Sequence, residues 1–89
     1  METGDWYREQ TYNLKNGKAE WKYYHIKNII PENNIAEIDV YKIFHNGNIS
    51  TPKQSNSPVE VFEKLTKLSA EYAYTVLKIK LPTQEKKEV

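Results

Sequence analysis

The fold is decided by residues 5–30, which read DWYREQTYNLKNGKAEWKYYHIKNII. Asn16-Gly17 stands near the middle of this stretch, between two runs rich in aromatic and β-branched residues. Asn-Gly supplies the two residues of positive φ that a type I′ turn needs, and it is the strongest short-range signal for a β-hairpin. The pattern therefore predicts a hairpin with strands over residues 5–14 and 18–30.

A two-residue loop fixes the register of a hairpin, so the cross-strand pairs follow from the sequence. Tyr12 is expected opposite Trp21, and Trp6 opposite Lys27. Because strand side chains alternate between the two faces, one face of this hairpin gathers aromatic rings and cations. The residues of this face are Trp6, Arg8, Gln10, Tyr12, Trp21, Tyr23, His25 and Lys27.

Asn46-Gly47 predicts a second hairpin by the same rule, with strands over residues 35–45 and 48–51. Phe44 is expected opposite Ile49, on the same face as Val40. Residues 31–34 form a turn between the two hairpins, and residues 51–56 are polar and contain Pro52, which predicts a loop.

Ser57-Pro58-Val59-Glu60 matches a capping box with Pro at the first helical position. Apolar residues then recur at the helical period, which predicts one long helix over residues 58–80. A shorter helix followed by a fifth strand within residues 74–81 is the alternative, because apolar residues and lysines alternate there. The expected stripe comprises Val61, Leu65, Leu68, Tyr72, Val76 and Ile79.

These elements define an α+β fold, in which a four-stranded antiparallel sheet from two Asn-Gly hairpins is followed by a C-terminal helix. The chain has 89 residues, enough for one domain, which we expect over residues 1–82 with a polar tail over 83–89. A homodimer is expected, because the helix stripe and the small sheet together present more apolar surface than they can cover.

Composition excludes several classes of protein. Thirteen Lys and Arg against twelve Asp and Glu give a net charge of +1, unlike a histone-like cationic protein. The absence of cysteine excludes disulfides, thiolate metal sites and a Cys nucleophile. Without a long apolar run or a signal-peptide pattern, the sequence predicts a cytoplasmic protein with no membrane partner.

Catalytic patterns are sparse, which predicts a protein that is not an enzyme. His25 and His45 lie in different hairpins, no Ser has the context of a nucleophile elbow, and the three glycines are isolated. No metal and no cofactor is therefore expected. Glu37 and Asp39 share one face of a strand, where the plain interpretation is a solvent-facing edge.

Interleaved aromatic rings and cations favour binding of a single-stranded nucleic acid, because bases stack on rings while Lys and Arg neutralise phosphates. Residues 15–27 hold four Lys and one Glu, so a nearly neutral chain can still be locally basic. The alternative is that this face of the first hairpin is core, which a helix covering Trp21 and Tyr23 would establish. The predicted contact residues are Arg8, Trp21, Tyr23, Lys27, Lys42 and Lys53.

Residues 20–72 resemble the positive-cofactor-four family of single-stranded-DNA-binding coactivators, whose fold of four strands and a helix is also seen in Whirly and Pur-alpha proteins. The resemblance implies a dimer formed through the helix, with strand surfaces that hold an unpaired strand. The family's basic-Gly-apolar segment is replaced here by Gln54-Ser55-Asn56-Ser57. The matching residues are Ile38-Asp39-Val40, Asn46-Gly47, Pro52-Lys53, Phe62 and Leu65.

A small protein–protein interaction module, such as an inhibitor or adaptor from a mobile element, is the other functional hypothesis. Tyr, Trp and Arg also dominate the energetics of protein interfaces. The net charge near zero favours this hypothesis, because nucleic-acid binders are usually more basic.

Overall fold

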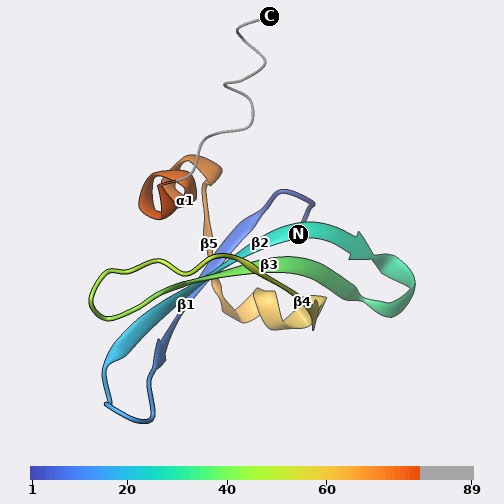
Figure 1. Cartoon of the computed structure of the whole chain (residues 1–89). Coiled ribbons are helices and arrows are strands. Elements are labelled where there is room, and N and C mark those ends of the chain that lie inside the picture. Colours follow the sequence, from blue (N-terminus) through green and yellow to red (C-terminus); the bar gives the residue numbers. More distant parts are fainter. Residues whose placement is uncertain (79–89) are drawn as a thin grey trace, which may run out of the picture.

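The computed structural model describes residues 1–78, in which one five-stranded antiparallel sheet is combined with a short α-helix (Figure 1). The α+β class is confirmed, with five strands in place of the predicted four. The order across the sheet is β4-β3-β2-β1-β5. The elements are β1 (Trp6–Tyr12), β2 (Ala19–Ile30), the 3₁₀ helix η1 (Pro31–Asn33), β3 (Ile35–Ile43), β4 (Lys53–Pro58), the 3₁₀ helix η2 (Val59–Lys64), β5 (Thr66–Leu68) and α1 (Ala70–Leu77).

β1 and β2 form the predicted first hairpin, but the predicted register is wrong by two residues. Trp6 lies opposite His25, and Tyr12 lies opposite Ala19. The connection is a wider loop closed by the Asn13 amide, which donates to the Lys18 carbonyl at 2.9 Å, and Gly17 takes a φ of 68° within it. A shift by two residues leaves each side chain on its predicted face, because side chains alternate with period two.

The second hairpin also differs from its prediction. Ile43, one residue before Phe44, forms the bridge to Ile49. Residues 51–56 were expected to form a loop, but β4 begins at Lys53 and pairs antiparallel with β3. Polar residues suit this strand because it lies at the exposed edge of the sheet, where Lys and Pro discourage pairing with other chains.

The predicted long helix over residues 58–80 is wrong within the described residues, which instead form η2, β5 and α1 in turn. Val61 belongs to the predicted buried stripe but is exposed, whereas its neighbour Phe62 is buried. The alternative, a shorter helix followed by a fifth strand within residues 74–81, is also wrong within the described residues. The additional strand, β5, comes before the α-helix and not after it. Pairing of β5 with the edge of β1, together with burial of Phe62 against the sheet, outweighs local helix propensity. Residues 79–80 and the predicted tail 83–89 lie outside the described residues.

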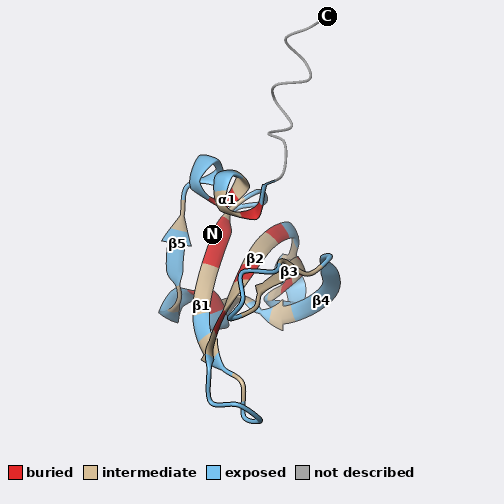
Figure 2. Ribbon diagram, turned by 60° about the vertical axis from the view of Figure 1, so that its left-hand side comes forward, coloured by how far each residue is buried: buried red, intermediate tan, exposed pale blue. Residues whose placement is uncertain are grey.

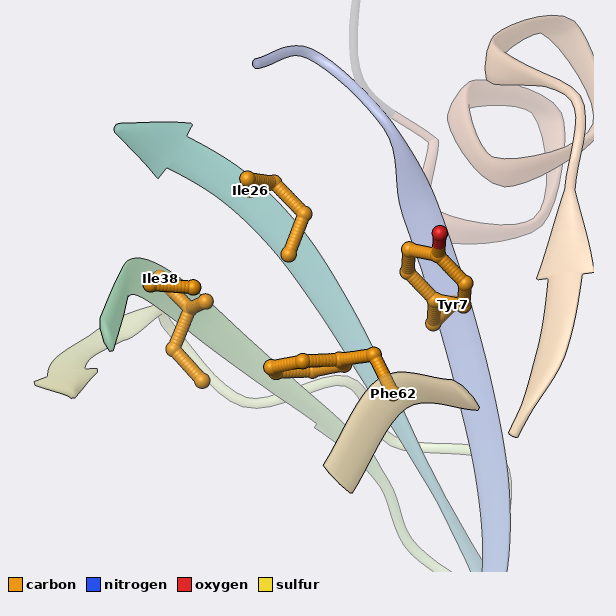
Figure 3. Packing of buried hydrophobic residues seen from close by; sticks show 5 residues of the cluster. Tyr7, Ile26, Ile38 and Phe62 are labelled. Atoms are coloured by element: carbon orange, nitrogen blue, oxygen red, sulfur yellow. The ribbon is translucent and has the colours of Figure 1, made fainter. Parts of the chain in front are cut away.

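Each face of the sheet carries its own hydrophobic cluster, and Figure 2 shows the buried positions along the ribbon in red. The face covered by η2, here the η2 face, holds a cluster in which Phe62 points toward the strands (Figure 3). The opposite face, here the α1 face, is covered by the α-helix. The buried residues are Tyr7, Ile26, Ala36, Ile38 and Phe62 on the η2 face, and Trp6, Tyr23, Ala73 and Leu77 on the α1 face.

Candidate nucleic-acid interface

The aromatic face predicted as a stacking platform is largely the core beneath α1. Tyr23 is only 3% exposed and Trp6 only 1%, and both pack with Ala73 and Leu77 of the helix. Tyr23 therefore cannot stack on a base, which corrects the role predicted for it. Trp21 is half-buried at the margin of the same cluster.

Arg8 lies at this margin between two aromatic rings. Its guanidinium carbon is 4.6 Å from the centre of the Trp21 ring and 5.5 Å from that of Tyr72. Its Nη1 donates to the hydroxyl of Tyr72 at 3.0 Å and to that of Tyr23 at 3.5 Å. These contacts connect β1 to α1, so the structure gives Arg8 a role in holding the helix on the sheet.

Lys27 is placed apart from the other predicted cations by a bulge in β2 between Ile26 and Asn28. Its Nζ lies 3.4 Å from a carboxylate oxygen of Asp39. This ion pair, with Lys27 exposed and Asp39 largely buried, leaves Lys27 partly neutralised.

Two predicted residues, Lys42 and Lys53, come together on the η2 face with Lys22. They line an open groove of about 390 Å³, which we call the lysine groove. Its lining contains three lysines and no carboxylate. The lining residues are Lys22, Val40, Lys42, Phe44, Ser50, Lys53, Gln54 and Ser55.

Strand register builds the groove. Lys22 of β2 and Lys42 of β3 are cross-strand partners, and Lys53 of β4 is the partner of Val40, two residues before Lys42. The segment after the Asn46-Gly47 turn is fixed by Ser50, whose amide donates to the Lys42 carbonyl at 2.8 Å and whose Oγ accepts from the Lys42 amide at 2.9 Å.

Lys42 is held in place by a buried carboxylate. Glu20 is 3% exposed, and its Oε1 lies 3.5 Å from the Lys42 ammonium, while Asn13 donates to its other oxygen at 3.3 Å. The same ammonium is 5.4 Å from the centre of the Phe44 ring. Lys22 forms no ion pair with any described residue, nor does Lys53, so both can meet an external anion.

The net charge conceals a separation of charge along the sheet. Residues 7–24 and 40–53, which form the end of the sheet around the lysine groove, carry six Lys and Arg and two carboxylates. The other described residues carry four Lys and eight carboxylates. One end of the sheet is therefore basic although the chain is nearly neutral.

Sequence reasoning missed Lys22, Phe44 and Ser50 as members of one site. Strand alternation puts Lys22 on the face of the first hairpin opposite the aromatic face, as the structure also has it, but the groove further requires β4. The long polar stretch after Pro52 gave no apolar alternation that would have revealed this edge strand.

Comparisons with protein-family models, curated proteins and solved structures find no match for this chain. Among residues 1–78, no helix is both long enough and apolar enough to cross a membrane. Within the same residues, no group of three or more His, Asp or Glu is placed to hold a metal ion.

Proposed function

We propose that this protein binds single-stranded nucleic acid and that the lysine groove makes its principal phosphate contacts. The observation that carries the proposal is the convergence of three lysines, from three different strands, on a groove that no carboxylate lines. Neutralising phosphates releases counterions from the nucleic acid, which supplies most of the affinity of sequence-tolerant binding.

The composition of the groove favours an unpaired strand. Phe44 provides an aromatic ring beside the lysines, and a ring of this kind can stack with a base that is free of its partner. Ser50, Ser55 and Gln54 supply hydrogen-bonding groups suited to phosphate and sugar oxygens. A volume of about 390 Å³ suits a segment the size of a nucleotide.

The proposed contact set differs from the one predicted from the sequence. Lys42 and Lys53 remain, and Lys22 joins them. Tyr23 is left out because it is buried, and Lys27 because it pairs with Asp39 on the other face. Arg8 and Trp21 are also left out, because they lie on the α1 face, opposite the lysine groove.

The test is fluorescence anisotropy with a labelled oligo-dT, titrated at several salt concentrations between about 50 and 200 mM. Two phosphate contacts, made by the unpaired Lys22 and Lys53, predict a slope of log affinity against log salt of about −1.4, because each contributes about −0.7 on a single strand. Lys53→Glu and Lys22→Glu are each expected to weaken binding about tenfold and to make the slope shallower. Lys42 is not varied, since its loss would leave the carboxylate of Glu20 buried without its cation.

Lys64→Glu is the matched control, because it changes the net charge by the same amount at an exposed position of η2 outside the groove. It is expected to retain most of the affinity. Absence of binding by the unmodified protein at low salt would refute the proposal. An equal loss of affinity in Lys64→Glu and Lys53→Glu would show that the groove is not the site.

A protein–protein module remains the second candidate, favoured by the partly exposed cluster of Arg8, Trp21 and Tyr72. These three residue types are typical of binding hot spots. Capture of a partner that survives nuclease digestion and is lost in Tyr72→Ala would support this candidate. Homodimer formation stays a prediction, for which the sedimentation mass of the purified chain is the measurement.

A further inference from the structure

The first hairpin extends beyond the rest of the sheet as a two-stranded arm. Pairing of β1 with β5 ends at Arg8, and pairing of β2 with β3 ends at Trp21. From Gln10 to Glu20, here the arm, the two strands have only each other as neighbours among the strands of the described chain. Figure 1 shows this blue loop projecting from the sheet, and Figure 2 shows that its tip is exposed.

The tip of the arm is held by hydrogen bonds. The Asn13 amide donates to the Lys18 carbonyl at 2.9 Å, and the Gly17 amide donates to the Asn13 carbonyl at 2.7 Å. The side-chain oxygens of Asn13 and Asn16 accept from the amides of Lys15 and Lys18, both at 2.8 Å. The loop therefore presents its side chains in a preorganised arrangement, which reduces the entropy lost on binding.

Two large apolar side chains are displayed at this tip. Leu14 is 100% exposed and Tyr12 is 64% exposed. Lys15 and Lys18 flank them, and the residues from Gln10 to Ala19 include no carboxylate.

We propose that the arm is a second contact for the nucleic acid, in which Tyr12 and Leu14 pack against unpaired bases while Lys15 and Lys18 meet the flanking phosphates. This inference rests on the proposed function of the lysine groove. Aromatic rings stack with bases of any sequence, and Leu is among the apolar residues that proteins insert between bases.

The charge of the arm indicates an anionic occupant, and its connection to the lysine groove favours nucleic acid. Lys15 and Lys18 lie in the loop that leads into β2, the strand that carries Lys22 of the lysine groove, so the cations of the arm and of the groove can meet one polyanion. Glu20 interrupts the series in sequence, but it is buried and paired with Lys42. An anionic membrane is the competing occupant, and the experiment below separates the two.

The experiment measures oligo-dT affinity and its salt dependence for the full chain and for Tyr12→Ala, Leu14→Ser and Tyr12→Phe. Tyr12→Ala is expected to weaken binding about fivefold or more, because base stacking on a ring makes a contribution of that order. The salt slope should stay unchanged, since no cation is removed, and Tyr12→Phe should restore the affinity. Leu14→Ser should also weaken binding, whereas Val61→Ser, at an exposed apolar position outside the arm, should not.

The proposal for the arm and the proposal for the lysine groove can be refuted separately. Lys15 and Lys18 would add two phosphate contacts to those of the groove, so the arm predicts a steeper salt slope of about −2.8. If the unmodified protein binds with a slope of about −1.4 while Tyr12→Ala and Leu14→Ser bind equally well, the arm proposal is overturned and the groove stands. If the unmodified protein does not bind, both proposals fall. Sedimentation with phosphatidylserine vesicles that is lost in Leu14→Ser, combined with unchanged oligo-dT affinity, would assign the arm to a membrane and overturn the inference.

Discussion

His25 is the residue whose environment has the clearest consequence for stability. Its ring stacks on that of Trp6, with centres 4.4 Å apart and planes 14° apart. Burial lowers the pKa of His25 below its ordinary value of about 6.5, with help from Lys27 and opposition from Asp39. The folded protein therefore favours neutral His25, while the unfolded chain takes up a proton near pH 6.5.

This pKa shift predicts that the free energy of unfolding is highest above pH 6.5 and declines as the pH falls through that value toward the lower pKa of the folded state. Urea unfolding at a series of pH values between about 7 and 5.5 measures the decline. His25→Phe, which keeps a flat ring against Trp6, should remove most of it. His45→Gln, at an exposed loop position, should leave it in place, and the reverse pattern would contradict the assignment.

At the residue scale, the sequence correctly predicts which face of the first hairpin each side chain occupies. The predicted register is wrong by two residues, but side chains alternate between faces with period two, so each keeps its face. It did not decide how deeply Tyr23 is buried. The same alternation describes a solvent-exposed platform and a sheet packed under a helix, and only the position of α1 distinguishes them.

At the scale of elements, the start of the α-helix provides a direct test of the fold. Ser69 caps α1, since its Oγ accepts from the Tyr72 amide at 3.2 Å. Ser57, which the sequence pattern predicts as a cap, lies within β4, and the N-cap of η2 is Pro58, with no side-chain capping hydrogen bond. Ser69→Ala is therefore expected to cost about 1 kcal/mol of unfolding free energy.

Ser57→Ala serves as the comparison, and we expect it to change the unfolding free energy by less than about 0.5 kcal/mol. Thermal or urea unfolding of the two variants checks the pair. A larger loss in Ser57→Ala than in Ser69→Ala would indicate that a helix begins near residue 58, as the sequence pattern suggested.

The elements after Thr51 could not be predicted because long-range pairing determines them. β4 is a polar strand that forms by adding to the edge of β3, and β5 has only three residues, which pair with β1. Neither strand has the apolar alternation by which a strand is recognised in a sequence. The Asn-Gly turns, by contrast, act locally, and both lie in hairpin connections.

At the scale of the whole molecule, one sheet separates two small hydrophobic cores. Basic residues gather at the end of this sheet that surrounds the lysine groove. The α+β class followed from the sequence, whereas the site required the order β4-β3-β2, which brings lysines from three strands together. The net charge of +1 gave no sign of this arrangement, because the basic end is balanced by carboxylates elsewhere in the chain.

The central claim is that the lysine groove binds single-stranded nucleic acid, and the most direct test is an NMR titration of the ¹⁵N-labelled chain with oligo-dT. The predicted result is that the largest amide shifts fall at Lys22, Lys42, Phe44, Ser50 and Lys53 and diminish as salt is added. Shifts concentrated instead around Tyr72 and Trp21 on the α1 face, or a spectrum that the oligonucleotide leaves unchanged at low salt, would contradict the claim.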